Sequence, residues 1–195
     1  MLRDSTRDPG FTEPTVTTSL LWETSTLSML QGKTMQTPEP QKEHQWLQRL
    51  VGEWTFEGEC NPGPDQTPMK STGKEVVRSL GGLWTVGEGE GEMPSGGTCT
   101  SIMTLGYDPQ IGRFVGTFIA SVMTHLWPYN GSLDAAEKVL TLDSEGPSFA
   151  DDGTMAKYQD IIEFVSDDHR ILSSQFLGED GQWVPFMKAH YRRTK

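Results

Sequence analysis

Basic side chains are scarce in this sequence, where 16 Lys and Arg stand against 27 Asp and Glu and give a formal net charge of −11 at pH 7. Binding to nucleic acid or to an anionic membrane surface depends on cationic side chains that neutralise phosphate. The composition therefore argues against both classes of partner. We interpret the acidity as a contribution to solubility.

Cysteines and long apolar runs are scarce as well. Cys60 and Cys99 lie far apart, without the close spacing of a zinc site and too few for a disulfide framework. No stretch approaches the roughly 20 apolar residues of a membrane-spanning helix. The apolar cluster at residues 20–22 is interrupted by Glu23 and by hydroxyl side chains, unlike a secretory signal. These absences favour a reduced, cytoplasmic setting, and they leave a single bridge between the two thiols open.

Motifs that would assign a reaction are missing too. The sequence has no Gly-x-Ser-x-Gly elbow and no His-Glu-x-x-His helix, and the glycines of residues 87–91 alternate with acids that would repel phosphate. Glu88, Glu90 and Glu92 fall on one face of a strand, where a solvated acidic row is the expected role. The sequence therefore indicates no specific enzyme and no metal site.

The sequence changes character near residue 35. Residues 1–34 are dominated by Thr, Ser, Pro and Asp, and we interpret them as a disordered leader or an upstream extension. Residues 35–195 are patterned throughout, and this length suits one core rather than two. We expect a single domain over residues 35–195.

The pattern of the domain begins with a helix and continues with strands. Residues 41–51 place four apolar side chains at helical spacing, and Gly52 suits the end of this helix. His44, in the same helix, is expected on its surface. Residues 53–60 then alternate between aromatic or small side chains and glutamate or threonine, as in a half-buried strand.

About ten strands are expected in all, with no helical segment between them. Their boundaries are turn sequences such as Asp108-Pro109, Asn130-Gly131 and Asp180-Gly181. This order predicts an all-β fold, an antiparallel up-and-down barrel with one short N-terminal helix over one mouth. A barrel of this size can enclose a ligand cavity.

Several motifs occur in an order that resembles a known family. They are Gly52-Glu53-Trp54, Leu80-Gly81-Gly82-Leu83-Trp84, Gly106-Tyr107-Asp108-Pro109, Thr124-His125-Leu126-Trp127 with Asn130-Gly131, Phe186-Met187 and Tyr191-Arg192-Arg193. Over residues 36–193 the sequence is similar to the DUF1579 family, an uncharacterised group placed among lipocalin-like, or calycin, barrels. The resemblance implies a barrel with an interior pocket and adds little about chemistry.

A remoter resemblance is to nitrobindin-like barrels, which bind haem through a histidine on their final strand. His190 occupies a similar place, although the Gly-Trp-Gly motif of that family is matched only at its start, by Gly52-Glu53-Trp54. Strand alternation puts His190 on the face of Lys188 and Arg192, so it points out of the barrel unless a bulge shifts the register. Haem is an alternative ligand, and no other cofactor is expected.

The leading functional hypothesis is the binding of a small, largely apolar molecule inside the barrel. The expected walls are Trp54, Trp84, Met103, Phe118 and Met187, and the expected orienting groups are His125, Tyr158 and Gln175. Two further alternatives are an enzyme with His125 as general base and a filled barrel that acts only as an interaction module. The oligomeric state, a homodimer included, stays open.

Overall fold

The computed structural model describes residues 37–61, 67–93, 96–150 and 152–195, and it contains one short helix followed by ten strands. Their bounds are α2 (Lys42–Gln48), β1 (Gly52–Cys60), β2 (Met69–Leu80), β3 (Trp84–Glu92), β4 (Thr98–Asp108), β5 (Arg113–Ala120), β6 (Trp127–Leu133), β7 (Val139–Pro147), β8 (Met155–Ser166), β9 (His169–Leu177) and β10 (Trp183–Arg193). The predicted leader at residues 1–34 lies outside the described residues. Among the described residues, no helix combines the length and the apolar character needed to cross a membrane.

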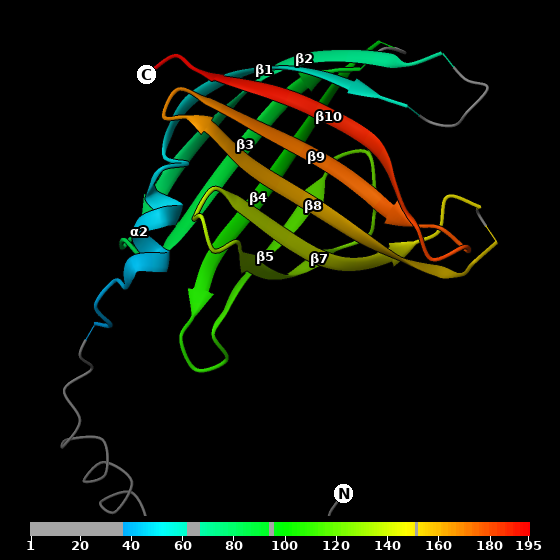
Figure 1. Cartoon of the computed structure of the whole chain (residues 1–195). Coiled ribbons are helices and arrows are strands. Elements are labelled where there is room, and N and C mark those ends of the chain that lie inside the picture. The colour runs from blue at the N-terminus through cyan, green and yellow to red at the C-terminus, as the bar shows by residue number, and fades with distance from the viewer. Residues whose placement is uncertain (1–36, 62–66, 94–95, 151) are drawn as a thin grey trace, which may run out of the picture. The chain divides into compact units, whose positions relative to one another are not determined.

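The strands form a closed antiparallel barrel, as the sequence predicts. Each strand pairs with the next along the chain, and β1 pairs with β10 to complete the ring (Figure 1). Closure means that no strand of the described barrel lies at an open sheet edge. The fold is therefore an up-and-down barrel within a compact unit that spans residues 39–195.

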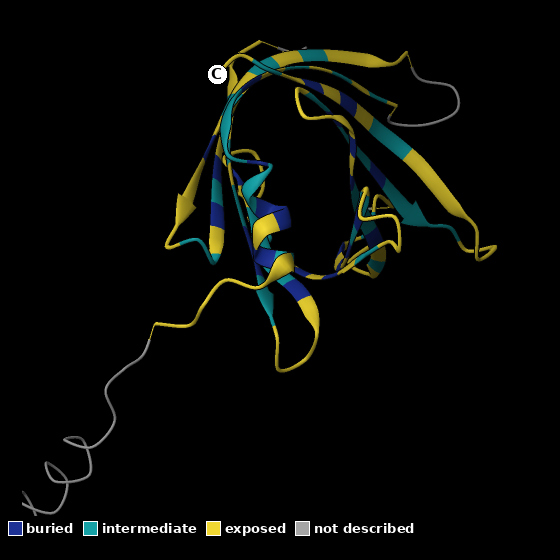
Figure 2. Ribbon diagram, turned by 60° about the vertical axis from the view of Figure 1, so that its left-hand side comes forward, coloured by how far each residue is buried: buried dark blue, intermediate teal, exposed yellow. Residues whose placement is uncertain are grey.

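Side chains alternate between the interior and the outer face because successive residues of a strand point to opposite sides. On β1, Trp54 is buried whereas Thr55 is exposed, and Figure 2 shows this alternation along the strands. Glu88 and Glu90 lie on the outer face of β3, where they form ion pairs with Arg78 and Lys74. The acidic row is thus part of a solvated, charged outer surface.

Helix α2 packs against the barrel and buries an apolar side. Trp46 and Leu47 are buried, and the ring of Trp46 meets Phe114 and Phe164 edge-on, with centroids 6.0 and 5.3 Å apart. Its indole N–H donates to the carbonyl oxygen of Glu137 at 2.8 Å, which anchors the helix to the β6–β7 connection. The helix is shorter than the predicted span of 41–51, because a turn follows it at Arg49 and Leu50.

His44 is buried, and the prediction of a surface position was wrong. The helix packs against β3 and β4, so this side chain faces the barrel instead of water. The Nε2 atom of His44 lies 3.1 Å from the carbonyl oxygen of Tyr107, and Nδ1 accepts a hydrogen bond from the backbone N–H of Gln41 at 2.9 Å. Both ring nitrogens therefore have partners, which makes the burial of a polar ring tolerable.

Asn130-Gly131 lies inside strand β6, and its prediction as a turn was wrong. Gly131 faces the interior, where a Cβ atom would come within 2.7 Å of the Leu142 side chain. The turn lies four residues later, where the Asp134 carboxylate accepts hydrogen bonds from the backbone N–H groups of Lys138 and Val139. The glycine therefore serves close packing between β6 and β7 instead of turn formation.

Candidate functional site

A cavity of about 280 Å3 lies inside the barrel, away from α2 and near the connections that follow β5 and β7. Fourteen side chains from seven strands and two loops line it: Met103, Phe118, Met123, Trp127, Tyr129, Ser144, Pro147, Phe149, Tyr158, Asp160, Leu172, Ser174, Phe186 and Met187. Most of them are apolar or aromatic. Strand alternation explains the set, because most lining residues occupy inward positions of their strands.

Aromatic rings form much of the cavity wall. The ring of Trp127 meets that of Tyr158 edge-on at 5.0 Å, and Phe149 packs in the same way against Tyr158 and Phe186 at 5.6 and 5.0 Å. Trp127 lies directly over Gly146, where an added Cβ atom would approach the indole to 2.2 Å. Gly146 therefore leaves the space that lets the indole form part of this wall.

The polar groups of the cavity gather around Asp160. One oxygen of its carboxyl group accepts a hydrogen bond from the hydroxyl of Tyr129, and the other accepts one from the hydroxyl of Ser174. Burial raises the pKa of the Asp160 carboxyl, against the opposing effect of these two hydrogen bonds. Burial, followed by the nearby charge of Asp160, raises the pKa of Tyr129 well above its ordinary range, so the phenol stays protonated and acts as a donor.

A second polar cluster fills the interior beside the apolar core. Arg170 of β9 forms a buried ion pair with Glu75 of β2, and its guanidinium lies over the rings of Trp54 and Tyr191 at 4.9 and 4.0 Å. Burial raises the pKa of Tyr191, and the charge of Glu75 adds to this effect. None of these residues lines the cavity. The opposite charges of Arg170 and Glu75 compensate each other within the packed part of the barrel.

Four residues of the predicted site meet at the cavity. Met103, Phe118, Tyr158 and Met187 all line it. The hydroxyl of Tyr158 donates to the carbonyl oxygen of Pro147 at 2.6 Å, which holds its ring in the wall. The structure therefore brings these four residues together around one interior cavity.

The other four residues of the predicted site lie elsewhere. Trp54 faces inward but belongs to the packed core, where its indole N–H donates to the carbonyl oxygen of Leu50 at 2.8 Å. Trp84 lies on the outer face of β3 and is 38% exposed. His125 lines an outer groove, and Gln175 donates a hydrogen bond to Gln159 at 2.7 Å on the outer face of β9. None of the four lines the cavity.

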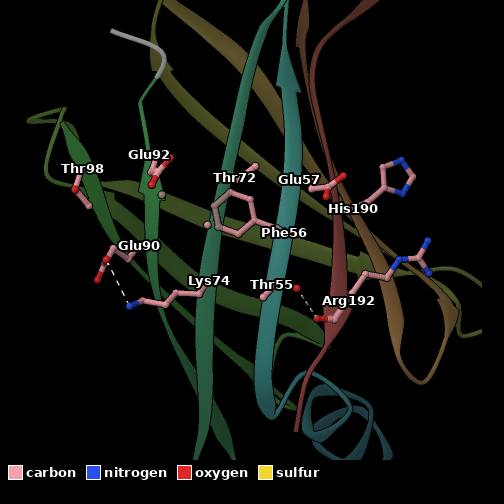
Figure 3. A pocket seen from close by; sticks show the side chains of 12 residues that line it. Thr55, Phe56, Glu57, Thr72, Lys74, Glu90, Glu92, Thr98, His190 and Arg192 are labelled. Atoms are coloured by element: carbon pink, nitrogen blue, oxygen red, sulfur yellow. Dashed lines mark hydrogen bonds and ion pairs between the residues drawn. The ribbon is translucent and has the colours of Figure 1, made fainter. Parts of the chain in front are cut away.

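His190 points away from the interior, as Figure 3 shows. Its Nδ1 atom lies 3.1 Å from Nε2 of His169 on the outer face of the neighbouring strand. A haem held by His190 would need this imidazole inside the barrel, so the residues of the cavity do not fit such a group. Within the described parts of the chain, no cluster of three or more His, Cys, Asp or Glu side chains could hold a metal ion.

Ten of the fourteen lining residues were not part of the predicted site, and strand alternation could have found several of them, Tyr129 and Ser174 among them. Tyr129 lies two residues after Trp127, and Ser174 lies two residues after Leu172, so both share the inward face of their strands. Phe186 could not have been found in this way. The register of β10 shifts between Pro185 and Met187, which brings Phe186 and Met187 to the same cavity although they are adjacent.

A larger hollow of about 850 Å3 lies on the outer face of β1, β2, β3 and β10 (Figure 3). Polar and charged side chains line most of it. Among them, Lys74 and Glu90 form an ion pair with 3.5 Å between Nζ and Oε1. The hydroxyl of Thr55 donates to the backbone carbonyl of Arg192 at 3.5 Å. Because this groove is open to solvent and lined mainly by polar and charged side chains, it is less suited to a small apolar ligand than the interior.

Comparison with known proteins identifies a family for this chain. The family model described as "Protein of unknown function (DUF1579)" matches residues 39–193. No protein of curated function matches the sequence.

Among solved structures, Rv2717c from M. tuberculosis has a TM-score of 0.54 at 15% identity, covering 80% of this chain and 100% of that one. The S-type phycobiliprotein lyase CPES from Guillardia theta has a TM-score of 0.49 at 13% identity, covering 81% and 99%. A redesigned beta barrel, mFAP0, bound to DFHBI, has a TM-score of 0.42 at 12% identity, covering 75% and 100%. The likeness to Rv2717c shows a shared fold.

Proposed function

This chain belongs to the DUF1579 family of proteins of unknown function, and from its interior we propose that it binds a small, largely apolar ligand in the barrel cavity. The observation that supports the proposal is an interior hollow walled by aromatic and methionine side chains, with one cluster of polar groups. Ligand sites usually combine such apolar walls with a few convergent polar groups.

The volume of the cavity limits the size of the ligand. At about 280 Å3 it is near the lower end of ligand pockets, which range from about 300 to 1,000 Å3. An engineered apolar cavity of about 150 Å3 in another protein is enough to bind benzene. A ligand with two fused rings, or a chain of similar bulk, therefore suits this cavity.

Some residues of the cavity give the site its shape, and others orient the ligand. Met103, Phe118 and Met187 provide adaptable and flat apolar walls, as the sequence-based hypothesis expects. Asp160 with its two hydroxyl partners takes the orienting role that the hypothesis gave to His125 and Gln175. Tyr158 contributes its ring, since its hydroxyl is engaged by a backbone carbonyl.

The other functional hypotheses receive no comparable support. His190 and His125 both lie outside the cavity, so neither haem binding nor general-base catalysis is proposed for it. A domain of residues 35–195, a cytoplasmic location and a homodimer stay predictions. Cys60 and Cys99 carry free thiols.

The proposal can be tested by direct binding to the full chain. Isothermal titration calorimetry with 1-naphthalenemethanol, a neutral two-ring probe, is expected to give saturable binding with one site per chain. Met187→Trp adds an indole to the wall and is expected to abolish this binding, because the added ring occupies the cavity. Val76→Trp is the matched control, since Val76 is 50% exposed on the outer face of β2.

Native mass spectrometry of protein purified from cells provides a second measurement, in which a retained small molecule adds mass that denaturation removes. Equal probe binding by the native chain and by Met187→Trp would place binding outside the cavity. Absence of both probe binding and a retained molecule would overturn the proposal.

A further inference from the structure

We propose that the ligand of this cavity is an organic cation, namely a small apolar amine bound in its ammonium form through Asp160 and the surrounding aromatic rings. This inference rests on the proposed function and names the chemical class of the ligand. It follows from three features of the wall: one carboxylate, several aromatic faces and no basic group.

The first feature is the hydrogen bonding of the Asp160 carboxylate. Both of its hydrogen bonds come from hydroxyl groups, of Tyr129 and Ser174, and an ionised carboxylate accepts such bonds at both oxygens. Two oxygens offer about four acceptor positions, so the carboxylate has capacity left for a donor on the ligand. Asp160 is half-buried and lines the cavity, where a bound ammonium group can reach it.

The second feature is the number of aromatic rings around the same space. Six of the fourteen lining residues are aromatic: Phe118, Trp127, Tyr129, Phe149, Tyr158 and Phe186. The negative face of an aromatic ring attracts a cation, most strongly where water is excluded. An apolar amine can place its hydrocarbon part against these rings and the methionines while its charge meets both the rings and the carboxylate.

The third feature is the balance of charge near Asp160. Of the described residues that line the cavity, Asp160 is the only one with a charged side chain, and Tyr129 and Tyr158 are the other titratable groups. The neighbouring strands β7 and β9 face it with Leu142 and Ser174. Arg170, the inward cation of β9, is engaged by Glu75. A cationic ligand would therefore supply the charge that the cavity wall does not.

The same features oppose an anionic ligand. A carboxylate or phosphate in this cavity would meet Asp160 as a like charge with no basic side chain to offset it, which disfavours such partners strongly. A neutral ligand could still use the apolar walls. The distinction between an amine and its neutral analogue is therefore the informative one.

Three probes of nearly equal shape test this inference on the full chain. They are 1-naphthylmethylamine, 1-naphthalenemethanol and 1-naphthoate, which differ mainly in the charge of one substituent. At pH 7 the amine is expected to bind at least about tenfold more tightly than the alcohol, since hydrogen bonds to charged groups are stronger than neutral ones. The naphthoate is expected to bind most weakly.

Asp160→Asn is expected to remove the preference for the amine while keeping the affinity for the alcohol. Asp143→Asn is the matched control, because it removes one negative charge from an exposed position on the outer face of β7 and should leave the preference unchanged. With the native chain, acidification that protonates Asp160 should weaken amine binding and leave alcohol binding unaltered. This pH series does not depend on the folding of a variant.

The outcomes separate this inference from the proposed function. Equal affinities for the amine and the alcohol, or tightest binding of the naphthoate, would overturn the organic cation and leave the binding cavity intact. A preference for the amine that survives Asp160→Asn would also overturn the role of the carboxylate. If none of the three probes binds, the proposed function and this inference fail together.

Discussion

Among the described residues that line the cavity, Asp160 carries the only charged side chain. An ionised carboxylate inside a protein is costly unless hydrogen bonds or an opposite charge compensate it. Here the hydroxyls of Tyr129 and Ser174 compensate it in part, and burial still raises the pKa of Asp160. The residue therefore lowers the stability of the ligand-free fold near neutral pH, which is the usual consequence of a functional polar group in an apolar site.

Asp160→Asn is expected to stabilise the fold at pH 7. Because the folded-state pKa of Asp160 is raised above its unfolded value of about 3.9, the folded chain holds this proton to higher pH than the unfolded chain. The native protein therefore loses stability as the pH rises through this window, and asparagine, which does not titrate, avoids that loss. The measurement is the free energy of unfolding in urea between pH 3 and pH 8.

The advantage of Asp160→Asn should disappear below about pH 4, where the native carboxyl is protonated in both states. Asp143→Asn on the outer face serves as control, with an expected change within about 0.5 kcal/mol. A variant that is less stable than the native chain at pH 7 would show that the hydrogen bonds outweigh the burial of the charge.

Strand alternation predicts inward positions better than residue type predicts a site. Met103 and Met187 fall on the inward face of the predicted strands, and both line the cavity. The polarity of Gln175 favours it as an orienting group, yet its neighbour Ser174 has the inward position. The aromatic side chain of Trp84 favours it as a wall, whereas Thr85 next to it faces the interior. Alternation shows that a side chain such as Trp54 points inward. It does not show how far along the barrel axis the side chain lies, and this position separates Trp54 from the cavity.

At the scale of strands, β2 and β9 are joined across the interior by the ion pair of Glu75 and Arg170. The two strands are not neighbours in the sheet, so this contact spans the barrel. The side chains of Arg170 and Glu75 are 3% and 12% exposed, and Trp54 and Tyr191 cover the guanidinium. Removing one partner would leave a buried charge without compensation.

Glu75→Ala is expected to destabilise the fold by about 3–5 kcal/mol, because Arg170 would remain buried without its carboxylate partner. Glu88→Ala, on the outer face of neighbouring β3, removes an exposed ion pair with Arg78 and is expected to change stability by at most about 1 kcal/mol. Chemical denaturation of both variants measures the difference. Similar effects of the two substitutions would mean that the buried pair adds nothing beyond a surface pair.

The strands themselves were largely predictable because apolar and polar residues alternate and glycine, proline or aspartate marks most turns. The exceptions arise from contacts with neighbouring strands. Asn130-Gly131 has a turn sequence but lies in β6, where glycine is needed for close packing against β7. The shift in β10 between Pro185 and Met187 depends on pairing with β9, which no local pattern records.

At the scale of the whole barrel, the pairing of β1 with β10 closes the ring. The paired residues run from Trp54 opposite Arg193 to Cys60 opposite Met187. The apolar core lies between Trp46 and Tyr191 in the sequence. All the contacts that we assign to the cavity and the core therefore come from residues within the predicted domain of 35–195.

A chain of residues 35–195 is expected to fold with the same stability as the full chain and to bind the neutral naphthalene probe equally well. The reason is that the ring of strands, the helix and the cavity lie within these residues, and stability follows the surface buried in that core. Guanidinium unfolding measures this through the midpoint and the slope of the transition, which reports the surface exposed on unfolding. Equal midpoints and slopes would support a domain boundary near residue 35. A lower midpoint or weaker probe binding of the shortened chain would instead assign part of the folding free energy to residues 1–34.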